Sequence, residues 1–224
     1  PRVRRQRQMC IRDREWAGRG EAVVPAISGY EAYVKYASQF VKDSTARRMA
    51  TDHARFMAGR TNRYTGKPYS ESPAIMSWQV ANEPRAFSDE GKPMLKSWIQ
   101  ETARAIREVD PNHLVSTGSE GKYGCEVDLD LWEEIHSMPE IDYAIIHIWP
   151  YNWQWAHRDS LMQDVENSRV KSGEYIAEHT ERAAKMKKPL VIEEFGYPRD
   201  NMGLAPGSPT TVSYTHLTLP TNSR

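Results

Sequence analysis

Two glutamates stand at the ends of apolar stretches of the chain, where their side chains could carry out acid–base chemistry. Glu83 follows the stretch AIMSWQVAN and precedes Pro84, and Glu194 is the last residue of the stretch PLVIEE. Hydrolysis of a glycosidic bond needs a pair of carboxyl groups: a protonated one on the leaving oxygen and an ionised one at the sugar carbon. The two glutamates therefore predict such a site, provided that the fold brings their side chains together.

Each glutamate by itself is open to a simpler interpretation, as a helix cap or as part of a surface ion pair. Two of them, each at the end of an apolar stretch, make that interpretation harder to hold. Glu193 complicates the choice because it directly precedes Glu194. Successive residues of a strand point to opposite faces of a sheet, so only one of these two is expected to face the site.

The elements that must position these residues follow from the alternation of apolar and helical stretches. Four short apolar stretches have the character of strands: residues 74–81, 113–118, 141–149 and 189–196. Apolar residues at helical spacing separate these stretches and also precede the first of them. Near-continuous apolar strands that alternate with helices are typical of a parallel sheet covered by helices, so we expect an α/β fold.

The spacing of the strands limits the kind of sheet that they can form. Their first residues lie 39, 28 and 48 positions apart, which scatters around the roughly 31 residues per unit of an eight-unit (β/α)8 barrel. Four such units are visible, so the residues alone leave open either an open doubly wound sheet or part of a barrel. In both folds the site lies at the carboxyl ends of the strands.

Further candidate residues stand at these carboxyl ends. His147 and Trp149 share one face of the third strand, so their side chains are expected to project together. Pro84 disfavours the α region for the residue before it, so we expect Glu83 to continue in an extended backbone toward the mouth of the sheet. Trp153, in the loop after the third strand, is a candidate for stacking on a sugar ring, and packing of this loop onto the rim is the alternative.

Four segments together resemble a known family. WQVANEPR, VSTGSEG, IDYAIIHIWPYNW and KPLVIEEFG look like strands four to seven of glycoside hydrolase family 5, a family of retaining glycosidases with a (β/α)8-barrel fold. The likeness is greatest to its β-mannanase-like branch. It covers roughly residues 30–199, and the conjunction of NEP and EFG in that order makes it specific. The resemblance implies a partial (β/α)8 barrel that holds about strands four to seven and is not closed.

The resemblance also implies a role for each matching residue. Glu83 matches the acid/base of the family, Glu194 its nucleophile, and Asn82 the asparagine that binds the 2-hydroxyl of the sugar. His147 matches the histidine of strand six, which the family follows two positions later with a tyrosine that donates to the nucleophile. This chain has Trp149 there. An indole N–H can donate one hydrogen bond but cannot accept one, so this contact could survive in altered form or be lost.

The implied function is that of a retaining endo-β-glycosidase that hydrolyses β-1,4-mannan by double displacement with two glutamates. A β-1,4-glucanase of the same family and a non-catalytic carbohydrate-binding fragment are the alternatives. The resemblance implies no cofactor, no metal, a polysaccharide or oligosaccharide as the partner, and a monomer. Because the substrate is a polymer, we also expect an extracellular or periplasmic enzyme.

The composition fits a soluble globular domain. The chain of 224 residues is 39% hydrophobic and has a formal net charge of zero. It contains neither an apolar stretch long enough for a membrane span nor an apolar signal segment near its start. Its two cysteines, Cys10 and Cys125, are too few to predict a disulfide framework.

Both ends of the chain are expected to be non-native. Residues 1–14 hold six arginines and one aspartate, residues 206–224 lack amphipathic periodicity, and both segments resemble translated cloning adaptors. We do not expect the basic segment to bind nucleic acid. The predicted native domain is residues 15–205, a fragment that lacks strands one to three and strand eight and is inactive by itself.

Overall fold

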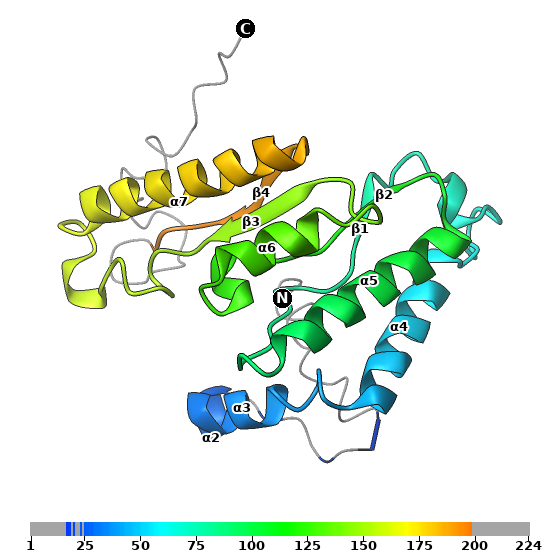
Figure 1. Ribbon diagram of the computed structural model, residues 1–224, viewed down its shortest axis with the longest axis horizontal. Coiled ribbons are helices and arrows are strands. Elements are labelled where there is room, and N and C mark those ends of the chain that lie inside the picture. Colours follow the sequence, from blue (N-terminus) through cyan, green and yellow to red (C-terminus); the bar gives the residue numbers. More distant parts are fainter. Residues whose placement is uncertain (1–16, 19, 21–22, 24, 199–224) are drawn as a thin grey trace, which may run out of the picture.

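The computed structural model describes residues 17–18, 20, 23 and 25–198 of the chain (Figure 1). The two terminal segments that we expect to be non-native, residues 1–14 and 206–224, lie outside the described residues. The helices of the described part are α2 (Pro25–Ser28), α3 (Tyr30–Ala37), α4 (Ser44–Ala58), α5 (Lys92–Val109), α6 (Leu129–His136) and α7 (Val165–Met186). Short 3-10 helices lie at Tyr69–Glu71, Lys122–Cys125 and Arg158–Ser160.

All four predicted strands are present in shortened form. They are β1 (Ser77–Gln79), β2 (Leu114–Ser116), β3 (Ala144–Ile148) and β4 (Leu190–Phe195). β1 pairs with β2 and β3 pairs with β4, both in parallel. The parallel α/β fold is thus confirmed, although the ladders form two two-stranded sheets rather than one continuous sheet.

Asp142 joins the two sheets where a regular ladder is missing. Its backbone N–H donates to the carbonyl of Val115 at 2.9 Å, and its side-chain Oδ2 accepts from the N–H of Val115 at 2.7 Å. The same oxygen accepts from Arg107 Nη2 at 2.6 Å. A carboxylate therefore takes the place of a backbone acceptor between β2 and the segment that leads into β3. Together with the two ladders, this contact orders the strands β1–β2–β3–β4.

The helices follow the same order as the strands. α5 contacts β2, and α7 contacts both β3 and β4, while successive helices from α4 to α7 pack against their neighbours. The face of α5 that is turned inward is apolar at helical spacing, with Leu95, Trp98, Ile99, Ala103 and Ile106 buried. Within the described part of the chain, no helix is long and apolar enough to cross a membrane.

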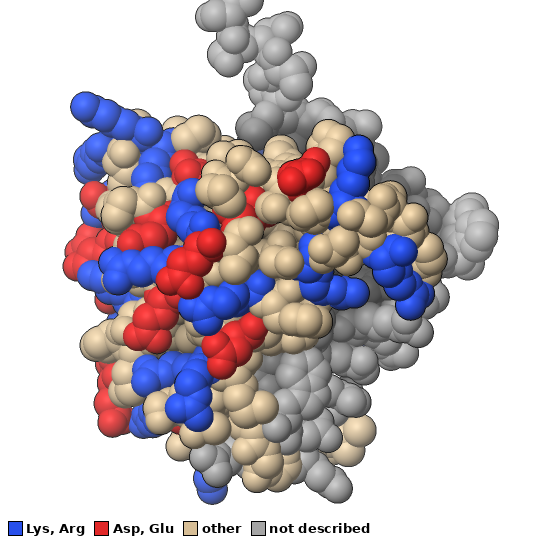
Figure 2. Space-filling view, turned by 90° about the vertical axis from the view of Figure 1, so that its right-hand side faces the viewer, with Lys and Arg blue, Asp and Glu red and all other residues tan. Residues whose placement is uncertain are grey.

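Charged side chains of both signs are interspersed over one face of the molecule (Figure 2). Some ion pairs join neighbouring helices, such as Lys96 Nζ with Glu134 at 2.6 Å and Arg182 Nη1 with Asp130 at 2.7 Å. Exposed pairs of this kind stabilise a fold by at most about 1 kcal/mol each. The apolar layer between helices and strands therefore holds the fold together.

Two fully buried histidines fasten α6 and α7 to the strand layer. The Nδ1–H of His136 donates to the carbonyl of Trp132 at 2.8 Å, and its Nε2 lies 2.9 Å from the hydroxyl of Thr117. In His179, Nε2 accepts from the backbone N–H of Lys122 at 3.0 Å. A proton on that nitrogen would abolish the bond, so the geometry requires a neutral ring. Burial lowers the pKa of His136 to about 3 and that of His179 to about 4.

The chain turns sharply at Gly118, two residues after the end of β2. The residue has φ +74°, and a Cβ placed there would lie 1.8 Å from the carbonyl oxygen of Ala81. The carbonyl of Gly118 accepts from the N–H of Glu83 at 2.8 Å. A side chain at position 118 would therefore push the segment after β1 away from β2, and Glu83 with it.

We expect Gly118→Ala to lower the free energy of unfolding by about 3 kcal/mol or more, because the added methyl combines a left-handed backbone with a collision against backbone atoms. Gly66→Ala is the matched control: Gly66 has φ +69° with nothing within 4 Å of its Cβ position. It should lose only about 1–2 kcal/mol from the backbone strain. Chemical denaturation of both variants measures the difference, and equal losses would show that the contact with Ala81 relaxes without cost.

Acid should destabilise the fold through the two buried histidines. Their pKa values are lower in the folded chain than in the unfolded chain, so the unfolded chain takes up protons first as the pH falls. Stability should be complete above about pH 6.5 and should fall by about 2–3 kcal/mol per histidine between pH 6.5 and 4.5.

Denaturation curves recorded at pH 7 and pH 4.5 test this expectation. His136→Gln should reduce the difference between the two curves, whereas the same change at the exposed His157 should leave it as it is. A pH dependence that is identical in the wild type and in His136→Gln would contradict the assignment.

Candidate active site

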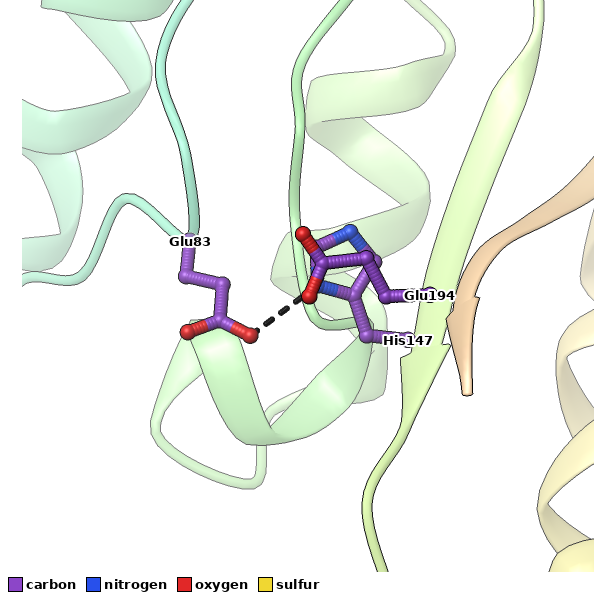
Figure 3. Close-up of side chains that lie close together, drawn as sticks. All are labelled: Glu83, His147 and Glu194. Atoms are coloured by element: carbon purple, nitrogen blue, oxygen red, sulfur yellow. Dashed lines mark hydrogen bonds and ion pairs between the residues drawn. The ribbon is translucent and has the colours of Figure 1, made fainter. Parts of the chain in front are cut away.

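Glu83, His147 and Glu194 meet at the carboxyl ends of the strands (Figure 3). His147 Nδ1 lies 3.0 Å from Glu83 Oε1 and 3.6 Å from Glu194 Oε2. One oxygen of each carboxylate and one nitrogen of the imidazole all lie within 4.8 Å of one another. The imidazole is almost wholly buried and both carboxylates are partly exposed. The convergence of the two predicted glutamates is therefore present in the structure.

The backbone of Glu83 differs from the expectation. We expected an extended conformation before Pro84, but the residue has φ +50°, in the left-handed region. The reason lies in its tertiary contacts: its N–H bonds to the carbonyl of Gly118, while Arg85 holds the following turn by donating to Glu120 Oε2 and to the carbonyl of Tyr123, both at 2.7 Å. The expectation of an extended backbone was wrong, although the side chain does reach the mouth.

Trp149 keeps a hydrogen bond to the predicted nucleophile. Its indole Nε1–H donates to Glu194 Oε2 at 3.2 Å. The six-membered part of the ring lies over Gly196, where a Cβ would come within 2.5 Å of Trp149 Cζ3. The contact thus survives in the altered form that an indole allows, and it depends on a glycine at position 196 that the sequence reasoning did not single out.

Glu193 and Glu194 reach different partners. Glu194 meets Trp149 and His147, whereas Glu193 accepts from the amide of Gln79 and, at 3.3 Å, from the hydroxyl of Tyr143. The register shifts at this point: Ile146 pairs with Ile192, but His147 pairs with Glu194. Because Glu193 is the extra residue of this β-bulge, regular alternation does not hold, and both carboxylates border the same hollow.

That hollow has a volume of about 480 Å³ and lies between β1, helix α4 and the end of β4. Asn82 lines it together with His147 and the two neighbouring glutamates. The structure therefore brings five of the six predicted site residues to one place, if Trp149 is counted through its bond to Glu194. The open volume beside the carboxylates is where a substrate could enter.

Trp153 lies elsewhere, in a cluster of aromatic rings. Its ring centroid is 4.5 Å from that of Tyr123, 5.0 Å from Trp155 and 5.1 Å from Tyr175. The side chain remains partly exposed. Packing of the loop onto the rim describes most of its surroundings, and a sugar-binding role for Trp153 stays a prediction.

Arg85 and Glu120 form a pair beside the site that the sequence reasoning did not assign. Glu120 is buried, and its carboxylate accepts from Arg85 Nε. Burial raises the pKa of Glu120, the Arg85 guanidinium opposes this rise, and the neighbouring Glu83 carboxylate adds to it. The available signals were an arginine directly after NEP and a glutamate between the glycines of GSEG, neither of which indicates the pairing.

Glu83, His147 and Glu194 could also hold a divalent cation, because each offers one ligand atom. Two carboxylate oxygens and an imidazole nitrogen suit zinc and similar ions. The same three groups can transfer protons and attack carbon without a metal. The expectation of a metal-free site stays a prediction.

Curated relatives of the chain are mannan-degrading enzymes by name. The chain is 32% identical over 168 residues to the putative mannan endo-1,4-beta-mannosidase 9 of Oryza sativa subsp. japonica, a match that covers 70% of this chain and 39% of the relative. It is 31% identical over 188 residues to the mannan endo-1,4-beta-mannosidase 1 of Arabidopsis thaliana, which covers 75% of this chain and 44% of the relative. The chain thus spans less than half the length of these relatives.

Solved structures show the same likeness. The glycoside hydrolase family 5 mannosidase of Rhizomucor miehei matches with a TM-score of 0.75 and 27% identity, covering 90% of this chain and 49% of that one. The endo-beta-1,4-mannanase of Thermotoga petrophila matches with a TM-score of 0.58 and 26% identity, covering 79% and 41%. These neighbours are (β/α)8 barrels, so of the two sheets left open by the sequence, the partial barrel is confirmed.

The family is settled by a match over nearly the whole chain. The family described as GH family 5 beta-mannosidase-like matches residues 12–218. This range holds the two glutamates, the histidine between them and every described strand. The chain therefore belongs to the beta-mannosidase-like group of glycoside hydrolase family 5.

Proposed function

We propose that this chain carries the catalytic carboxylates of a retaining endo-β-glycosidase that hydrolyses β-1,4-mannan. The observation that carries the proposal is the approach of Glu83 and Glu194, whose nearest carboxylate oxygens lie within 4.8 Å with His147 beside both. Retaining enzymes hold their carboxyl groups about 5–5.5 Å apart, whereas inverting enzymes leave roughly 6.5–9.5 Å for a water molecule. The short separation favours double displacement.

In the first step, Glu83 acts as the acid and protonates the leaving glycosidic oxygen, while Glu194 attacks the anomeric carbon. The Trp149 N–H, 3.2 Å from Glu194 Oε2, holds one carboxylate oxygen in place. This leaves the other oxygen of Glu194 for the attack. In the second step, Glu83 accepts a proton from water, and the water releases the sugar from Glu194.

The relatives support mannan as the substrate. The similar proteins are named as mannan endo-1,4-beta-mannosidases, and a family 5 mannosidase from Rhizomucor miehei is described in complex with mannosyl-fructose. A β-1,4-glucanase would use the same two carboxylates and would differ in its contacts to the 2-hydroxyl. A polymeric substrate favours an enzyme that works outside the cytoplasm.

The activity belongs to a complete barrel. In the described residues, β1 and β4 each have a strand partner on one side only, so the hollow beside Glu83 and Glu194 is open. The present chain alone is therefore expected to be inactive. Activity tests need the chain together with the remaining strands of a barrel, and we call this protein the complete enzyme below.

In the complete enzyme, Glu83→Gln and Glu194→Gln should each lower kcat on mannan at least about 100-fold, because an amide can neither supply a proton nor attack carbon. Glu193→Gln is the matched control and should cost less than about tenfold, since the amide still offers an oxygen to Gln79 and Tyr143. Initial rates on β-1,4-mannan measure the three effects. An equal loss in Glu193→Gln would contradict the choice of Glu194 over Glu193 as the nucleophile.

The first product released from a β-linked mannan should be the β-anomer. Double displacement inverts the anomeric carbon twice, so its configuration is retained. Proton NMR of a fresh digest, recorded before mutarotation, checks this outcome. Release of the α-anomer would show that Glu194 activates a water molecule instead of bonding to the sugar.

The preference for mannan is tested with two polymers in parallel. The complete enzyme should hydrolyse β-1,4-mannan and leave carboxymethyl cellulose almost untouched. The reverse preference would support the glucanase alternative. Binding of either polymer without any hydrolysis would support a carbohydrate-binding role.

A further inference from the structure

A hydrogen bond joins β1 to β4 close to the two carboxylates of the site. Gln79, in β1, donates from its amide Nε2 to Glu193 Oε1, in β4. The two residues are 114 positions apart in the chain. They connect the first and last strands of the described part, which are paired to different neighbours. The bond therefore links the two sheets through β1 and β4, two strands that do not pair with each other.

A second donor steadies the same carboxylate. The hydroxyl of Tyr143 lies 3.3 Å from Glu193 Oε1, 2.7 Å from Gln79 Nε2 and 2.6 Å from Ser77 Oγ. Burial raises the pKa of Glu193, while the hydrogen bonds from Tyr143 and Gln79 oppose this rise. Glu193 is thus an acceptor held by a residue of β1 and by the residue that directly precedes β3.

The two ends of this bond are close in sequence to the two carboxylates of the site. Gln79 ends β1, four positions before Glu83, and Glu193 immediately precedes Glu194. Glu193 is also the extra residue of the bulge, where the register between β3 and β4 shifts. Without this shift, the pairing would give His147 the partner Glu193 rather than Glu194. The anchoring of Glu193 thus keeps Glu194 opposite His147.

We propose that Gln79 and Glu193 form a positioning pair that sets the separation of the Glu83 and Glu194 carboxylates. This inference rests on the proposed function for its catalytic consequence. Both residues also line the hollow beside the site, but the role assigned to them here is to position Glu194 and not to react with the sugar. The pair acts through the bulge, and its loss lets Glu194 move relative to Trp149 and His147. A displacement of about 1 Å at a reacting group can lower a rate about 100-fold.

The test exchanges the amide of Gln79 and the carboxylate of Glu193. Gln79→Glu places two carboxylates against each other, while the double variant Gln79→Glu/Glu193→Gln restores a carboxylate–amide bond in the opposite direction. We expect Gln79→Glu to lower kcat of the complete enzyme about 100-fold with KM nearly unchanged. The double variant should recover most of this loss. If Gln79→Glu does not fold, Gln79→Met replaces it in the test, because this change removes the hydrogen-bond donor without adding a charge. It should also lower kcat.

A control elsewhere in the chain has the same chemistry. Gln100, on α5, donates from Nε2 to Glu140 Oε2 at 3.3 Å, and neither residue lines the hollow beside the site. Gln100→Glu should therefore change the melting temperature at most and leave kcat as it is. A loss of kcat in Gln100→Glu equal to that in Gln79→Glu would show a general effect of charge and overturn the proposal.

An NMR readout separates this inference from the proposed function, because it needs no turnover. The indole N–H of Trp149 reports its bond to Glu194, so its ¹H–¹⁵N signal in the present chain should shift in Gln79→Glu and return in the double variant. If the complete enzyme failed to hydrolyse mannan while the signal behaved in this way, the proposed function would fail and the positioning pair would stand. An indole signal unchanged in Gln79→Glu and Gln79→Met would overturn the pair.

Discussion

Parallel pairing of the strands is the constraint on which the rest of the structure depends. Parallel strands cannot be joined by a tight turn, so each strand is followed by a crossover that here contains a helix. All strands then run in one direction, and their carboxyl ends gather at one edge. Glu83 and Glu194 are 111 positions apart in the chain, yet they meet because each follows or ends such a strand.

The strand ends bring the two carboxylates of Glu83 and Glu194 close together, and neighbouring groups stabilise them. His147 lies between the two carboxylates, and the Trp149 N–H donates to one of them. Arg85 offsets the charge of the nearby buried Glu120. Polar groups therefore gather at the strand ends, whereas the layer between strands and helices is apolar. The polar strand ends hold the candidate catalytic groups, and the apolar layer stabilises the fold.

Polar contacts of three side chains fix how the helices and strands pack against one another. Buried His136 and His179 attach α6 and α7 to loops that follow β2, and Asp142 replaces a backbone acceptor between β2 and β3. The two histidines put polar groups in the interior with matched partners, and a buried polar group without a partner costs about 1–3 kcal/mol. The contacts thus specify one arrangement of the layers, which fixes where the strand ends lie.

The sequence by itself determined the alternation of strands and helices and the residues at the strand ends. Apolar stretches of strand length predicted β1 to β4, and the NEP and EFG motifs predicted that Glu83 and Glu194 would share a site with Asn82 and His147. These features depend on local patterns: strand alternation, helical spacing and the order of motifs along the chain.

The tertiary structure alone decided how these groups are aimed. The left-handed backbone of Glu83, the bulge at Glu193 and the indole bond of Trp149 each depend on a partner from a distant segment. So does the pairing of Arg85 with Glu120. A register shift by one residue leaves the apolar pattern of a strand almost unchanged but redirects its side chains. For this reason the sequence could name the two glutamates, while only the packing of the strands could set the distance between them.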